Sequence, residues 1–312
     1  MAGIEILIRD RRWRIGWLLI SFCLFLAVNG RAEAGGEIAV PSTSAGAVNL
    51  VSGPAAAEPA PQDWRLEFFP DRGRAFQPLE ADPREARFRL GFMTNKGDVY
   101  EDLGLGGDLG LLWAGLPDGG EITLTARGLF TARFDVFSES FDLRNTDFIG
   151  GAAAGWSGEN NSLELFVYHQ SSHLGDEILE RGEQKRIDYS RETARFLWSY
   201  SRDIFRFYAG PAYTFHGWPE KIRDKLDLQA GGACRFSLWK LNLFVAGDAQ
   251  ALGAHDFFVN TTGQAGVYLG ATDKTSNRQW IFFEIFQGHS AMGQFFDQWE
   301  SYQMIGVGYQ FR

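Results

Sequence analysis

Apolar and polar residues alternate along most of the chain from Ala86 to its end. Successive side chains of a β-strand point to opposite faces of the sheet, so this alternation indicates strands with one apolar and one polar face. The clearest case is 121–134, whose apolar face would carry Ile122, Leu124, Ala126, Gly128, Phe130, Ala132 and Phe134. Its other face would carry Glu121, Thr123, Thr125, Arg127, Thr131 and Arg133. The pattern predicts an all-β protein.

Segments with this alternation recur twelve times. Their lengths approach the roughly 9–11 residues that a tilted strand needs to cross a bilayer, and bacterial membrane barrels have an even number of strands. The expected strands are 86–95, 101–113, 121–134, 147–157, 162–172, 189–200, 204–216, 226–236, 240–251, 259–271, 278–288 and 301–312. We therefore expect a closed antiparallel transmembrane β-barrel of about 12 strands, formed by residues 86–312.

The connections between these segments alternate in length, as they do in bacterial barrels with short periplasmic turns and longer extracellular loops. The short set comprises 116–120, 158–161, 201–203, 237–239 and 272–277. The longer set comprises 96–100, 135–146, 173–188, 217–225, 252–258 and 289–300. A soluble sandwich would also alternate in polarity, so this asymmetry of the connections is what favours a membrane barrel.

Many charged residues fall on the polar face of these strands. The basic ones are Arg87, Arg89, Arg127, Arg133, Arg191, Arg195, Arg206 and Arg235, and the acidic ones are Asp108, Glu121, Glu164, Asp227, Asp248 and Glu284. A dry sandwich core could not hold so many charges, whereas a narrow and partly wet barrel interior can pair them. We expect most of them to form ion pairs that fill the lumen.

The N-terminus carries four arginines ahead of an apolar stretch from Ile15 to Val28. Ala32-Glu33-Ala34 then supplies the small residues that signal peptidase requires, which places cleavage before Gly35. We predict that residues 1–34 are a signal peptide, because the apolar core is short for an uncleaved anchor. Residues 35–62 are rich in Ala, Pro, Gly and Ser, so they should form a disordered linker.

The segment 63–85 differs from the linker because it contains several large apolar side chains, Trp64 and Phe68 among them. Pro78 and Pro83 would interrupt any regular element there. We expect this periplasmic N-terminal segment to pack at the rim of the barrel or to plug the lumen in part.

The composition also bears on location and partners. Asp and Glu number 39 against 30 Lys and Arg, which argues against nucleic-acid binding. Phe311 is the penultimate residue, and Arg312 departs from the terminal aromatic that the barrel-assembly machinery usually recognises. We expect a protein of the cell outer membrane whose partners are outer-membrane lipids and, during biogenesis, that machinery. The sequence leaves the oligomeric state open.

One predicted strand combines an apolar face with residues that can carry chemistry. In 162–172, Leu165 and Val167 share a face with His169 and Ser171, so the imidazole and the hydroxyl would face lipid near the outer leaflet. Polar groups at the bilayer edge are costly to place without a use, although the headgroup region tolerates them. His169 and Ser171 are therefore a candidate base and nucleophile.

The next strand supplies a candidate acid. If Ser171 lies opposite Ser190 across the hairpin, then His169 lies opposite Glu192, and directly opposed residues have Cβ atoms about 4.5–5.5 Å apart. Ser171, His169 and Glu192 would then form a nucleophile, a general base and an orienting acid. Three residues of the neighbouring loop are alternative acids, namely Asp188, Asp176 and Glu177.

The stretch Tyr168-His169-Gln170-Ser171-Ser172 resembles the histidine-x-serine strand of outer-membrane phospholipase A, a twelve-stranded barrel with a lipid-facing catalytic pair. Phe286-Gln287-Gly288-His289-Ser290 and Ile305-Gly306-Val307-Gly308-Tyr309 are similar to the last hairpin of that family. The resemblance implies hydrolysis of lipid acyl esters, with calcium near the outer loops as a cofactor.

The chain departs from that family in two respects. No asparagine stands where the phospholipases have their third catalytic residue, and Glu192 would take its place, as a glutamate does in the lipid A deacylase barrels. The glycine-rich continuation after the phospholipase serine is also missing here.

A second resemblance covers most of 64–312. The segments that carry it are Pro78-Leu79-Glu80-Ala81-Asp82-Pro83-Arg84-Glu85, His173-Leu174-Gly175-Asp176-Glu177 and Gly293-Gln294-Phe295-Phe296. They resemble an uncharacterised domain-of-unknown-function family of Gram-negative outer-membrane β-barrel proteins. This resemblance implies the barrel fold and no particular activity.

Other functions stay open, because a histidine-x-serine triplet arises easily by chance. A catalytically inert barrel would act as a narrow channel through its lumen charges, or as a structural or surface-binding protein through the loops 173–188 and 289–300. The sequence has no Cys/His cluster with zinc spacing and no dedicated calcium loop. Calcium therefore rests on the phospholipase resemblance alone.

Overall fold

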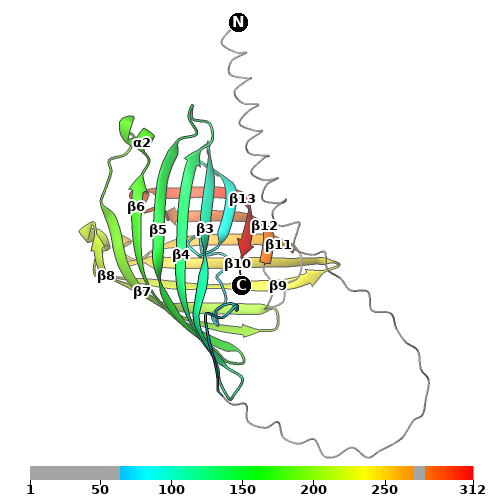
Figure 1. The fold of residues 1–312 in the computed structure, drawn as a ribbon. Coiled ribbons are helices and arrows are strands. Elements are labelled where there is room, and N and C mark those ends of the chain that lie inside the picture. Colours follow the sequence, from blue (N-terminus) through cyan, green and yellow to red (C-terminus); the bar gives the residue numbers. More distant parts are fainter. Residues whose placement is uncertain (1–63, 270–277, 312) are drawn as a thin grey trace, which may run out of the picture. The chain divides into compact units, whose positions relative to one another are not determined.

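The computed structural model describes residues 64–269 and 278–311, and the predicted signal peptide 1–34 and linker 35–62 lie outside this part. Twelve antiparallel strands close into a barrel in which β13 pairs with β2, and one further short strand, β1, joins the same sheet (Figure 1). Among the described residues no helix has the length and hydropathy to cross a bilayer. The predicted fold class is confirmed.

The barrel strands are β2 (Phe88–Asn95), β3 (Asp98–Gly115), β4 (Glu121–Asp135), β5 (Leu143–Ser157), β6 (Asn161–Leu174), β7 (Tyr189–Arg202), β8 (Phe205–Trp218), β9 (Lys225–Leu238), β10 (Leu241–Leu252), β11 (Phe258–Leu269), β12 (Arg278–His289) and β13 (Trp299–Gln310). Each of the twelve predicted segments overlaps one of them. The expected outer loop 96–100 is instead a two-residue turn, because Lys96 and Gly97 both adopt positive φ and Asp98 already belongs to β3. Such a turn matches the twist of the strands that it joins.

The two faces of the sheet have opposite character. The outward face exposes large apolar side chains, including Leu165, Val167, Phe196, Tyr213, Phe283 and Ile305. The inward face buries polar and charged ones, including Arg89, Thr125, Arg127, Glu164, Gln264 and Glu284. Lipid can solvate only the first kind of surface, so the apolar face is the one that contacts the membrane.

The predicted pairing of charges inside the barrel is confirmed for most of the strands concerned. Arg127 donates two hydrogen bonds to Glu164, at 3.0 and 2.7 Å, and a third to Asp108 at 2.7 Å. Other inward pairs are Arg89–Glu284 at 3.2 Å, Arg133–Glu300 at 2.8 Å and Arg195–Glu164 at 3.5 Å. A buried charge is costly unless it is paired in this way, and these pairs join both neighbouring strands and strands that are not adjacent in the sheet.

One barrel position is occupied by an interrupted strand. β1 (Arg65–Phe68) pairs with residues 112–115 of β3, and β2 pairs with residues 98–104 of the same strand. Because β4 pairs along the other edge of β3, β1 and β2 must share one edge. The sequence analysis did not predict β1. Between β1 and β2 the chain leaves the wall, and residues 69–87 run through the lumen.

Apolar contacts and backbone hydrogen bonds hold this lumen segment, 69–87, in place. Phe76 and Leu79 are fully buried in a cluster with Leu197 and Tyr208 of the wall. Arg206 of β8 donates to two carbonyl oxygens of the segment, at 2.6 Å to Pro78 and 2.7 Å to Gln77. Irregular backbone inside a barrel needs such partners, because an unpaired buried carbonyl is costly.

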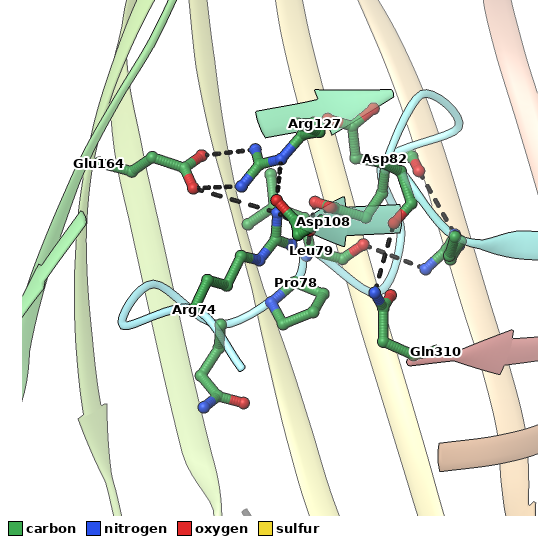
Figure 2. A network of polar contacts seen from close by, with 12 residues as sticks. Arg74, Pro78, Leu79, Asp82, Asp108, Arg127, Glu164 and Gln310 are labelled. Atoms are coloured by element: carbon green, nitrogen blue, oxygen red, sulfur yellow. Dashed lines mark hydrogen bonds and ion pairs between the residues drawn. The ribbon is translucent and has the colours of Figure 1, made fainter. Parts of the chain in front are cut away.

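Charged side chains of the lumen segment complete the ion pairs of the wall (Figure 2). Arg74 bonds Glu85 within the segment and approaches Asp108 of β3 at 3.4 Å. Asp82 accepts a hydrogen bond from Arg195 of β7 at 3.1 Å. Burial would raise the pKa of Glu85, but Arg74 and the other nearby guanidinium groups outweigh burial and lower that pKa to about 2. The segment and the wall thus form one charge-compensated interior.

A cavity of about 110 Å³ lies between the lumen segment and the outer loops, which contain four short helices. They are α2 (Asp176–Glu180), η1 (Glu220–Ile222), η2 (Gly253–His255) and η3 (Gly293–Phe295). The cavity floor includes Asp82 and Glu85 of the segment, and its outer wall includes His255 and Phe296. The cavity is thus lined by the lumen segment on one side and by the outer loops on the other.

Two stacked histidines join two of these outer loops. The rings of His255 and His289 lie with centroids 3.6 Å apart and planes 12° apart. Burial lowers the pKa of His255 to about 4, with further lowering by His289 and by Lys221 of η1, while Asp297 acts in the opposite direction. The stack therefore requires a neutral imidazole at His255.

Replacing Leu79 by alanine should lower the free energy of unfolding by about 2–5 kcal/mol, because the side chain is fully buried and the cavity left behind cannot collapse against a rigid wall. Denaturant unfolding of the refolded protein in micelles measures this. Leu66→Ala in β1 is the matched control, since Leu66 is 61% exposed and its replacement should change little. Equal losses in the two variants would show that Leu79 is not an anchor of the lumen segment.

The His255 pKa predicts a loss of stability in acid. The unfolded chain takes up a proton at His255 below its usual pKa of 6.5, whereas the folded protein does so only near 4, so the free energy of unfolding should fall as the pH drops through this window. Other groups titrate there too, so the measurement is the difference between wild type and His255→Gln in denaturant unfolding at several pH values. Parallel pH curves for the two proteins would contradict the assignment.

Candidate active site

The outer half of β6 places the predicted nucleophile and base on the lipid-facing side. Val167 and His169 are exposed and Ser171 is half-buried, whereas Gln170 and Ser172 are buried on the lumen side. Buried and exposed side chains alternate along β6 without interruption from its apolar first half to these residues. His169 and Ser171 therefore share the outward face, as the sequence predicts.

The predicted register between β6 and β7 is confirmed. His169 lies opposite Glu192, and Ser171 lies opposite Ser190. Nδ1 of His169 is 2.8 Å from Oε1 of Glu192. A carboxylate only accepts hydrogen bonds, so the imidazole donates through Nδ1–H and keeps the lone pair of Nε2 free. This is the tautomer that a general base needs when a carboxylate orients it.

Ser171 lies two residues from His169 along the same face. Its hydroxyl has no hydrogen-bond partner within 64–269 and 278–311, so the structure does not bond this serine to the imidazole of His169. The three alternative acids do not reach the imidazole: Asp176 and Glu177 begin α2, Asp188 precedes β7, and in the described part of the chain none bonds His169. Of the predicted carboxylates, the structure brings Glu192 to the histidine.

A second histidine, which the sequence analysis did not identify, completes the cluster. Nδ1 of His216 on β8 bonds Oε2 of Glu192, so that the carboxylate bridges two imidazoles from the strands on either side. A β-bulge between Glu192 and Thr193 shifts the pairing of β7 with β8 at this point. Strict alternation along β8 would place residue 216 on the lumen face. The alternation in the sequence therefore gives no sign that His216 faces lipid.

The lumen side of β6 is fastened directly behind this site. Ser172 bonds Asp147 of β5 and accepts a hydrogen bond from the backbone of Gln294 in η3 at 3.0 Å. Gly293 lies so close that a Cβ atom there would be 2.6 Å from Ser172 and Tyr189, so only glycine fits without displacement. The outer end of β6 is therefore held by η3 from inside the barrel. These contacts also fix the backbone that carries the outward side chains of His169 and Ser171.

The cluster does not fit calcium, the cofactor that the phospholipase resemblance implies. Calcium takes about six to eight oxygen ligands, and both oxygens of Glu192 already accept from imidazoles. Across the residues that the structure describes, no group of three or more His, Cys, Asp or Glu has the arrangement of a metal site.

Twelve closed strands with an apolar exterior and a charge-paired interior define a transmembrane β-barrel of the outer-membrane type. The chain belongs to the family DUF1207, described as proteins of unknown function, whose model matches residues 65–311. The match begins at β1 and so includes the lumen segment as well as the barrel. Among curated protein sequences, no relative matches the chain.

Solved structures of outer-membrane proteins are similar in fold at low sequence identity. The calcium-bound phospholipase dimer of Salmonella typhi is 13% identical, with 75% of this chain and 93% of that chain covered and a TM-score of 0.47. The Escherichia coli outer membrane phospholipase A is also 13% identical, with coverage of 74% and 92% and a TM-score of 0.48. OprD of Pseudomonas aeruginosa is 10% identical, with coverage of 78% and 97% and a TM-score of 0.31.

Proposed function

We propose that this protein is a serine esterase of the outer membrane that hydrolyses acyl esters of membrane lipids. The observation that carries the proposal is the hydrogen bond between His169 and Glu192 on the lipid-facing surface, with the unpartnered Ser171 hydroxyl beside it. A polar cluster of this kind is expensive to keep at the membrane surface without a function.

The chemistry assigned to the three residues is that of a catalytic triad. Ser171 Oγ attacks the ester carbonyl while His169 Nε2 takes its proton, and Glu192 stabilises the imidazolium through Nδ1–H. The imidazolium then protonates the departing alcohol oxygen, which releases a lysolipid and leaves an acyl ester on Ser171. A water molecule, deprotonated by His169, cleaves that ester and frees the fatty acid.

The surroundings of the cluster favour a substrate that lies in the membrane. Leu165 and Val167 continue the same face below His169, and Phe215 and Trp218 are exposed on β8 beside it. The His169 side chain is 52% exposed, so the cluster sits on an open surface rather than in a deep cleft. Acyl chains packed against this apolar surface would present their ester bonds at the level of the headgroups, next to Ser171.

Transport through the lumen has less support from the geometry. Residues 69–87 cross the interior, where Leu79 packs against Leu197 and Tyr208 of the wall and Asp82 accepts a hydrogen bond from Arg195. Residues of the outer loops line the cavity above this segment. A channel would require this segment to move, whereas His169 and Glu192 already bond each other on the lipid-facing side. Export by the predicted signal peptide and assembly by the barrel machinery would place the cluster in the outer leaflet.

Refolded protein in vesicles that contain glycerophospholipid or lipid A should release fatty acid. Ser171→Ala and His169→Ala should each lower the rate by more than about 100-fold, because they remove the nucleophile and the general base. Ser190→Ala is the matched control, since Ser190 lies directly opposite Ser171, and it should stay active.

Fatty-acid release and folding are measured on the same samples, with folding followed by circular dichroism and heat-modifiable gel migration. A folded wild type without activity on either lipid class would refute the esterase. Full activity in both Ser171→Ala and His169→Ala would do the same. Loss of activity in Ser190→Ala alone would show that the nucleophile is assigned to the wrong serine.

A further inference from the structure

We infer that His216 is a positioning residue of this site, which holds the second oxygen of Glu192 so that the first stays directed at His169. The inference rests on the proposed function, because it assigns His216 a role in the same reaction. It begins from the bridging carboxylate: Oε1 of Glu192 accepts from His169, and Oε2 accepts from His216. The three side chains come from β6, β7 and β8.

The β-bulge in the pairing of β7 with β8 lies directly next to His216. Below the bulge, Ala212 and Thr214 are buried in the lumen while Tyr213 and Phe215 are exposed on the lipid face. His216 follows directly and is also exposed, at 68% of its side chain, because Glu192 pairs with residue 216 while Thr193 pairs with residue 214. The extra residue reverses the alternation, and bulges are known to redirect side chains next to active sites.

Glu192 needs a second anchor more than a shorter acid would. Its side chain is 31% exposed, and a glutamate has three rotatable bonds, so a single hydrogen bond leaves several orientations open. A bond to each oxygen, from opposite sides, fixes the plane of the carboxylate. His169 then remains in the Nδ1–H tautomer, with Nε2 turned to its role as base.

The position of Ser171 decides which imidazole is the base and which is the anchor of Glu192. Ser171 is on the same strand and face as His169, two residues away, whereas two strand spacings separate it from β8. His169 is therefore the base and His216 the anchor. The neighbouring polar groups on this face are Ser190 and Glu192 of β7, and the carboxylate is the charged group that both imidazoles contact.

The test uses two substitutions that differ in one property. Asn places an amide nitrogen close to the position of histidine Nδ1, so His216→Asn keeps a donor for Glu192, while His216→Leu removes it. We expect His216→Leu to lower kcat by about 10- to 100-fold with little change in KM, because only the orientation of the base is lost. His216→Asn should remain within about threefold of wild type.

A second readout does not depend on turnover. The chain has 5 histidines, so ¹⁵N-histidine spectra in micelles are assignable by single substitutions. The nitrogen shifts of His169 should report the Nδ1–H tautomer in wild type and His216→Asn, and a mixture of tautomers in His216→Leu. A structural role of His216 in folding alone would leave these shifts unchanged in the folded variants.

The outcomes separate this inference from the proposed function. An inactive wild type refutes the esterase, while the tautomer measurement still decides whether His216 orients Glu192 and, through it, His169. An active wild type with unchanged kcat and tautomer in His216→Leu overturns the inference and leaves the esterase standing. Equal damage from Asn and Leu overturns the donor role, and a greater loss from His216→Leu than from His169→Ala shows that the two histidines have exchanged roles.

Discussion

The structure depends on one constraint: within a lipid bilayer each backbone N–H and C=O must be paired inside the protein. The pairing of β13 with β2 meets this requirement by closing the sheet. β2 is only 8 residues long and covers part of the edge of β3, whose lower end is instead paired with β1. Among the described residues, 105–111 of β3 have no strand partner on this edge, and residues 69–87 enter the lumen at this interruption.

Closure creates two surfaces of opposite chemistry on the same strands, and the interior must then balance its own charges. The wall supplies guanidinium groups such as Arg195 and Arg206, and the lumen segment supplies Asp82 and backbone carbonyls to meet them. Each side would be unstable without the other, because unpaired buried charges are far more costly than paired ones. The lumen is therefore a rigid, charge-paired core that supports the strands from within.

This rigid interior explains how chemistry can be built on the outside. Ser172 and Gln294 fasten β6 on the lumen side, directly behind His169 and Ser171 on the lipid side. Alternation along a strand makes the two functions compatible, since neighbouring residues serve opposite faces. The proposed esterase would receive its substrate from the membrane by lateral diffusion, and the bilayer would take the place of a binding pocket.

The sequence by itself determined the twelve strands and their inward and outward faces, because alternation with period two is a local property. The register that sets His169 opposite Glu192 was only a condition in the sequence, and the pairing of β6 with β7 decided it. The tertiary structure alone decided the position of β1, the path of residues 69–87 and their ion pairs, which join residues far apart in the chain. It also decided the place of His216. The bulge adds one residue to β8, and only the pairing with β7 shows where it lies. Beyond that residue the inward and outward positions of β8 are exchanged relative to the alternation in the sequence.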